Sequence, residues 1–142
     1  MKKIITKSEK ETFNLAKRFA LDLAGGEIIG LVGDLGAGKT IFAKGLAAGL
    51  GIKRTVNSPT FVLMKLYKVK NHPTIKQLCH IDAYRSQSLD ELINIGVAEY
   101  LNKKDTITVI EWVEKTNFSR KNKYSQIKIL HRNLNQRKII FS

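Results

Sequence analysis

The chain of 142 residues has the length of one domain, which we place over residues 1–142. Its content of 43% hydrophobic and 26% charged residues is ordinary for a globular protein, and no apolar stretch approaches the roughly 20 residues needed to cross a bilayer. The net charge of +13 favours contact with nucleic acid, but the cations are spread along the chain and no basic-aromatic stacking motif accompanies them.

The start of the chain does not predict export. Residues 1–5 are basic but lack a long apolar region and a small-residue cleavage site, so they do not resemble a signal peptide. The single cysteine, Cys79, lies in an apolar, strand-like stretch and has no partner for an internal disulfide. Together these features predict a cytoplasmic protein.

The predicted elements begin with a first strand that starts at residues 4–5. Ser8 and Glu11 then form a possible capping box before an apolar helical face, which the glycine pair at residues 25–26 ends. A short apolar run at residues 27–32 predicts a strand. The apolar residues after position 40 recur at helical spacing up to Gly51, which predicts a second helix.

The second half of the chain is rich in predicted strands. In order, it contains a loop at 55–60, strands at 61–69 and 74–81 joined by a turn at 71–73, a helical stretch at 88–100, a strand at 107–112, and a terminal hairpin of strands at 127–130 and 138–141. Alternating strands and helices predict an α/β fold with helices on both faces of the sheet. The late hairpins predict a sheet that is mixed but mostly parallel.

Residues 33–40 match the phosphate-loop pattern GxxxxGK[ST] at every specified position. In such a loop, glycines let the backbone N–H groups point at phosphate oxygens, Lys39 reaches the β- and γ-phosphates, and the Thr40 hydroxyl ligates Mg²⁺. Because the loop joins a strand to a helix, bound phosphates would also meet the helix N-terminus. We therefore predict a nucleotide site formed by Gly33, Asp34, Leu35, Gly36, Ala37, Gly38, Lys39 and Thr40.

Hydrolysis also requires a carboxylate and a group that positions water. Asp82 and Glu111 each follow a short apolar run, and the carboxyl ends of strands line the ligand crevice of an open α/β sheet, so both could face Thr40. The plainer interpretation is a polar residue where a strand reaches the surface. His80 is predicted to be packed or hydrogen-bonded, and the guanine-reading pattern NKxD at residues 102–105 is predicted to be a coincidence.

Four segments together resemble the bacterial TsaE family of small ATPases: residues 33–40, Ser58-Pro59-Thr60-Phe61, His80-Ile81-Asp82-Ala83-Tyr84-Arg85 and Glu111-Trp112. They occur in the order and spacing of that family, and the resemblance runs from about Ser8 to the terminal hairpin. It implies a single-domain phosphate-loop fold. It also implies membership of the machinery that installs threonylcarbamoyladenosine (t6A) beside the anticodon of tRNA.

The resemblance implies a weak Mg²⁺-dependent ATPase that acts within a complex with the TsaB–TsaD pair and is not itself the transferase. By position, Lys39 would hold the phosphates of ATP, and Thr40 and Glu111 would serve Mg²⁺. Asp82 would support hydrolysis, near the metal or by ordering water, and Trp112 would lie near the nucleotide.

Several alternatives stay open at this point. Family members tend to carry arginines near the final strands, and Arg132 and Arg137 are both candidates here. The phosphate loop is shared with small-molecule kinases, which add an acceptor pocket and an arginine-bearing lid, and with nucleotide-gated binding modules that barely hydrolyse. The Ser58-Pro59 loop could sense the γ-phosphate, although an ordinary proline turn is the better interpretation. We expect a monomer when the protein is alone, and a weak contact with tRNA is a further hypothesis.

Overall fold

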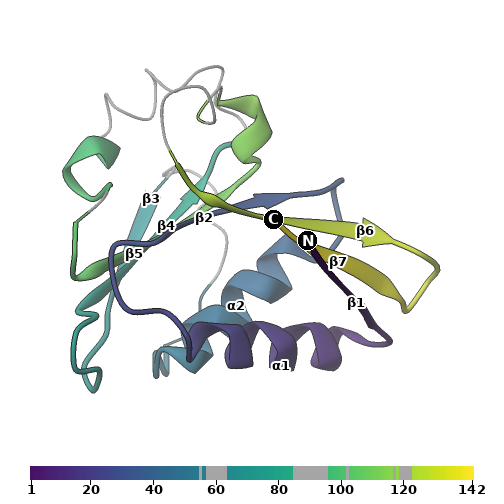
Figure 1. Cartoon of the computed structure of the whole chain (residues 1–142), viewed down its shortest axis with the longest axis horizontal. Coiled ribbons are helices and arrows are strands. Elements are labelled where there is room, and N and C mark those ends of the chain that lie inside the picture. Colours follow the sequence, from purple (N-terminus) through teal and green to yellow (C-terminus); the bar gives the residue numbers. More distant parts are fainter. Residues whose placement is uncertain (55, 57–63, 85–95, 102, 117, 119–122) are drawn as a thin grey trace.

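The computed structural model describes residues 1–54, 56, 64–84, 96–101, 103–116, 118 and 123–142 (Figure 1). Its elements are β1 (Lys2–Thr6), α1 (Glu9–Ala20), β2 (Ile28–Val32), α2 (Lys39–Gly49), β3 (Met64–Lys68), β4 (Gln77–Asp82), the 3-10 helix η1 (Val97–Glu99), β5 (Thr106–Glu111), the 3-10 helix η2 (Val113–Lys115), β6 (Ser125–His131) and β7 (Arg137–Phe141). The predicted loop around Ser58-Pro59 and the predicted helix from Ser88 to residue 95 lie outside the described residues.

The strands form one sheet in the order β1-β7-β6-β2-β5-β4-β3. The ladders β6–β2, β2–β5 and β5–β4 are parallel, whereas β3 pairs antiparallel with β4, β7 with β6, and β1 with β7. Only β3 and β7 therefore run against the common direction of the described strands. The mixed, mostly parallel sheet and both predicted hairpins are confirmed.

The two faces of the sheet are covered differently. Helices α1 and α2 lie against one face, where they bury residues of β2, β5 and β6 (Figure 1). The opposite face packs against Val97 of η1, Val113 of η2 and the buried ring of Phe118. In the described part of the chain, helical segments thus cover both faces, but those on the second face are short 3-10 helices.

Helix α1 begins as predicted at Ser8, whose Oγ accepts the N–H of Glu11 at 3.0 Å. The Glu11 carboxylate does not return to the N–H of Ser8. It accepts the N–H of Lys7 at 2.6 Å, so the capping box is displaced by one residue. The helix ends at Ala20, several residues before the glycine pair that was predicted to end it. No helix among the described residues combines the length and apolar character of a membrane span.

Two glycines let the helices approach each other closely. A Cβ atom on Gly45 would lie 2.2 Å from the Phe13 carbonyl oxygen, and one on Gly49 would lie 2.4 Å from that of Lys17. A side chain at either position would therefore push α2 away from α1. Because α2 starts at Lys39, this contact also fixes the direction in which the phosphate loop faces.

Candidate functional site

The phosphate loop connects β2 to α2 at the carboxyl end of the parallel strands. Gly33 is packed so tightly against β6 that a Cβ atom there would lie 2.4 Å from the Ile129 carbonyl oxygen. Gly38 is the N-cap of α2, has φ of 113°, and provides no side-chain cap, and the first turn contains no acidic residue. The first N–H groups of a helix have no intrahelical acceptor. The loop and helix start are therefore suited to an anion such as a phosphate group.

Lys39 is only 4% exposed and folds back over the loop. Its ammonium donates to the carbonyl oxygens of Gly33 at 2.5 Å and Asp34 at 2.8 Å. Burial lowers the pKa of Lys39, and the negative charge of Glu111 opposes that shift. The Nζ atom also lies 3.9 Å from the centre of the Trp112 ring. The cation is thus held at the loop by weak acceptors that a phosphate would outcompete.

Glu111 ends β5 and links two side chains from distant parts of the chain. Thr40 donates its hydroxyl to Glu111 Oε1 at 3.1 Å, and His80 Nε2 lies 2.6 Å from Glu111 Oε2. Both His80 and Glu111 are buried, with exposures of 1% and 2%. The prediction that Glu111 faces Thr40 is confirmed, and so is the prediction that His80 is hydrogen-bonded.

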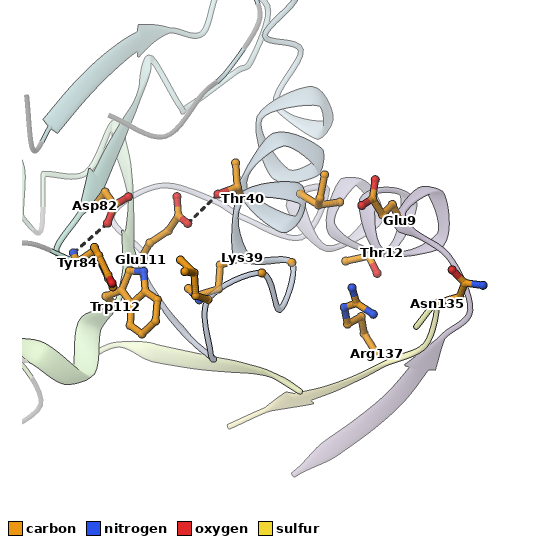
Figure 2. A pocket seen from close by; sticks show the side chains of 14 residues that line it. Glu9, Thr12, Lys39, Thr40, Asp82, Tyr84, Glu111, Trp112, Asn135 and Arg137 are labelled. Atoms are coloured by element: carbon orange, nitrogen blue, oxygen red, sulfur yellow. Dashed lines mark hydrogen bonds between the residues drawn. The ribbon is translucent and has the colours of Figure 1, made fainter. Parts of the chain in front are cut away.

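Asp82 ends β4 directly beside Glu111, since these two residues are register partners in the β4–β5 ladder. Its Oδ1 accepts the N–H of Tyr84 at 2.9 Å. Burial raises the pKa of Asp82, and the nearby charge of Glu111 raises it further. The predicted pair of carboxylates therefore converges at the edge of the sheet that carries the loop (Figure 2).

Trp112 follows Glu111 in a left-handed backbone conformation, with φ of 63°. It is the one non-glycine residue with positive φ in the described part of the chain. Its N–H donates to the Leu31 carbonyl at 3.0 Å, and its ring centre lies 4.9 Å from that of Tyr84. The indole is thus turned from the strand end toward Lys39.

A pocket of about 410 Å³ joins these groups. Its wall includes Leu35, Gly36, Gly38, Lys39, Thr40, Asp82, Glu111 and Trp112 from the predicted set (Figure 2). Three predicted residues do not line the pocket: Gly33, Asp34 and Ala37. Their carbonyls accept hydrogen bonds from side chains that line it, those of Gly33 and Asp34 from Lys39 and that of Ala37 from Arg137.

The pocket also extends to residues that the sequence did not single out: Glu9, Thr12 and Asn135. Of the two candidate arginines, Arg132 and Arg137, it is Arg137 that lines the pocket. Its Nε–H group donates to the Ala37 carbonyl at 2.8 Å. No local pattern identifies these residues, because they reach the loop from α1 and from the terminal hairpin.

Two other sequence features that the structure describes, the residues of the NKxD pattern from Lys103 on and Cys79, do not line this pocket. Lys103 to Asp105 precede β5, at the end of that strand opposite Glu111, so the NKxD pattern lies away from the phosphate loop. Ser58, Pro59 and Thr60 lie outside the described residues. Cys79 is buried and free, and burial raises its pKa to about 12.

The donor atoms at the loop fit Mg²⁺. Thr40 and Glu111 provide a hydroxyl and a carboxylate side by side, with Asp82 next to them, and hard oxygen donors are what Mg²⁺ prefers. The described residues contain no group of three or more His, Cys, Asp or Glu side chains arranged for a metal. Mg²⁺ usually binds through one or two carboxylates together with substrate phosphates, and the Glu111 carboxylate beside the Thr40 hydroxyl has the chemistry for that arrangement.

Comparison with known proteins gives a consistent result. Residues 6–139 match the family described as threonylcarbamoyl adenosine biosynthesis protein TsaE. The chain is similar to the tRNA threonylcarbamoyladenosine biosynthesis proteins TsaE of Bacillus subtilis, at 42% identity over 107 residues, and of Borreliella burgdorferi, at 43% over 106 residues.

Each match covers 75% of this chain, and they cover 63% of the Bacillus and 74% of the Borreliella protein. The chain therefore spans less than two thirds of the length of the Bacillus relative. The fold resembles the crystal structure of Bacillus YdiB, with a TM-score of 0.77, 32% identity, and coverage of 99% of this chain and 83% of that one.

Proposed function

This chain belongs to the TsaE family, and from that membership we propose that it binds and hydrolyses ATP in the t6A modification of tRNA. We propose further that it acts with the TsaB–TsaD pair and is not itself the transferase. The observation that carries the proposal is the hydrogen bond from Thr40 to Glu111 across the mouth of the phosphate loop. It puts a phosphate cradle, a hydroxyl and a carboxylate at one point, as nucleotide hydrolysis requires.

Binding is the task of Lys39 and the start of α2. When the triphosphate enters, Lys39 exchanges the carbonyls of Gly33 and Asp34 for phosphate oxygens, which form stronger, charge-assisted hydrogen bonds. The helix N-terminus contributes N–H donors and its partial positive charge. Arg137 already braces the loop through the Ala37 carbonyl, and it lines the same pocket.

Hydrolysis falls to the residues at the ends of β4 and β5. Thr40 and Glu111 would hold Mg²⁺, which would supply neutralising charge to the phosphates when bound. Because His80 occupies one oxygen of Glu111, the other is directed at Thr40. Asp82 stands beside them and would orient the attacking water through its carboxylate. Trp112 and Tyr84 form an aromatic wall on that side of the pocket.

The test is ATP hydrolysis measured with no phosphate acceptor, first with the protein alone and then with TsaB and TsaD. We expect slow release of phosphate that rises in the complex and is lost in Glu111→Gln. A small-molecule kinase would show turnover only with an acceptor. A nucleotide-gated module would bind ATP and the partners with no turnover in the complex, and that result would refute the ATPase assignment.

A further inference from the structure

A second concave surface lies at the other end of α2. It has a volume of about 640 Å³ and is bordered by residues 51–54, which follow α2, and by the edge strand β3 with the turn after it. None of its lining residues lines the nucleotide pocket. We call it the basic groove and define it by Lys53, Arg54, Leu66, Tyr67, Lys68 and Lys70.

The charge of the groove is of one sign. Lys53, Arg54, Lys68 and Lys70 are all exposed, and no aspartate or glutamate is among the described residues that line the groove. The surrounding sequence is also one-sided in charge. Between Asp34 and Asp82 the chain contains eight lysines and arginines and not one acidic residue. The positive potential here is thus not offset by neighbours in the chain, in contrast to α1, where Glu9 and Glu11 accompany the cations.

Tyr67 adds a second observation. Its side chain is only 2% exposed and lines the groove, and its hydroxyl has no hydrogen-bond partner within the described residues. The Arg54 guanidinium lies over the same ring, 5.6 Å from its centre. A buried hydroxyl without a partner is unfavourable, so this site offers a donor that lacks an acceptor. An anion in the groove would supply the acceptor.

We propose that the basic groove binds the phosphate backbone of RNA. Phosphates are the acceptors that clustered lysines and arginines contact most, and such contacts give affinity without reading sequence. Protein–protein interfaces, in contrast, are depleted in lysine, and the groove has three. The proposal does not depend on ATP hydrolysis, because the groove and the nucleotide pocket share no lining residue.

The test uses the full chain and an unmodified tRNA transcript, with binding followed by fluorescence anisotropy from 50 to 200 mM salt. We expect the double variant Lys68→Gln/Lys70→Gln to bind about tenfold more weakly at 50 mM salt. Its slope of log affinity against log salt should fall by roughly 1.4 to 1.8, since two phosphate contacts are lost. Tyr67→Phe should also weaken binding, with no change in slope, because it removes a donor and no charge.

The matched control is Lys2→Gln/Lys3→Gln, which removes the same charge from exposed positions on β1, the opposite edge strand. It should bind RNA nearly as the native protein does. Equal weakening in both double variants would show that only net charge matters, and would overturn the proposal. Native-like RNA binding by Lys68→Gln/Lys70→Gln would also overturn the proposal. If that variant instead lost binding to TsaB–TsaD, the groove would be a protein-binding surface. ATP hydrolysis measured on the same samples would show whether the proposed ATPase function stands separately.

Discussion

His80 Nε2 and Glu111 Oε2 lie 2.6 Å apart in the interior of the protein, on adjacent parallel strands. This contact fixes the carboxylate before any nucleotide arrives, because it leaves Oε1 to face the Thr40 hydroxyl. We therefore predict that His80 is a positioning residue that acts through Glu111. Its role is separable from nucleotide binding, since it is absent from the residues that line the pocket.

Replacing His80 with leucine should therefore lower kcat for ATP more than it lowers nucleotide affinity. It should also destabilise the protein by roughly 1–3 kcal/mol, because a buried carboxylate oxygen loses its partner. His80→Gln keeps an amide donor and should recover part of the lost turnover. Kinetics together with urea unfolding measure both effects. His131→Asn, at an exposed position, is the control, and a change in KM alone for His80→Leu would contradict the assignment.

Lys39→Ala should weaken ATP binding about 10- to 100-fold, the loss expected when charge-assisted hydrogen bonds to phosphate are removed. Calorimetry measures the affinity directly. Lys44→Ala, five residues further along α2, removes the same charge from a residue outside the pocket, and this variant should bind ATP normally. Native-like affinity in Lys39→Ala would refute the phosphate-loop assignment.

ATP binding should change the fluorescence of Trp112, which is the only tryptophan in the chain. The cause is the departure of the Lys39 ammonium, which lies 3.9 Å from the ring centre in this structure. Titration with ATP should give a saturable change in emission. In Lys39→Ala the starting spectrum should already differ, and nucleotide should cause little further change. An unaltered spectrum at saturating ATP in the native protein would show that Lys39 stays in place.

Asp82→Asn should stabilise the protein at neutral pH while it lowers turnover. Because burial raises the folded-state pKa of Asp82, the folded protein holds this proton more tightly than the unfolded chain does. Stability from this group is therefore present at low pH and is lost as pH rises through the folded pKa, above the ordinary value near 3.9.

Thermal unfolding between pH 4 and pH 8 tests whether the Asp82 carboxyl lowers stability as the pH rises. The asparagine variant, which keeps the Oδ1 acceptor for Tyr84, should lose less stability as pH rises across that range than the native protein does. A greater loss in the variant would show that the Asp82 charge is favourable.

Gly49→Ala should destabilise the protein by about 1–3 kcal/mol through overpacking against Lys17 and Ala20. Helix propensity alone predicts the opposite sign, since alanine is better than glycine in a helix by about 1 kcal/mol. The sign measured by chemical denaturation therefore decides between the two effects. Ala48→Gly, at the preceding position, should show the propensity effect by itself.

The sequence was sufficient for features that are local in the chain. The phosphate loop, the strands before Asp82 and Glu111, and both hairpins follow from patterns within a few residues. The contacts made by His80 and Arg137 do not, because they join segments 31 and 100 residues apart. The end of α1 and the partner of the Glu11 carboxylate also differ from the prediction. Helix α1 ends at Ala20, before the glycine pair, and Glu11 accepts the N–H of Lys7 in place of that of Ser8.

The left-handed backbone of Trp112 lowers the stability of the folded protein. A side chain in the left-handed region costs roughly 1–2 kcal/mol, a penalty that glycine would avoid. Trp112→Gly would remove that strain, but it would also remove the ring contact with Tyr84 and the packing against the buried cluster that includes Val113 and Phe118. The left-handed turn thus places one indole between the fold and the loop, where it packs on a buried cluster and meets the Lys39 ammonium, so an exchange at this position would disturb both.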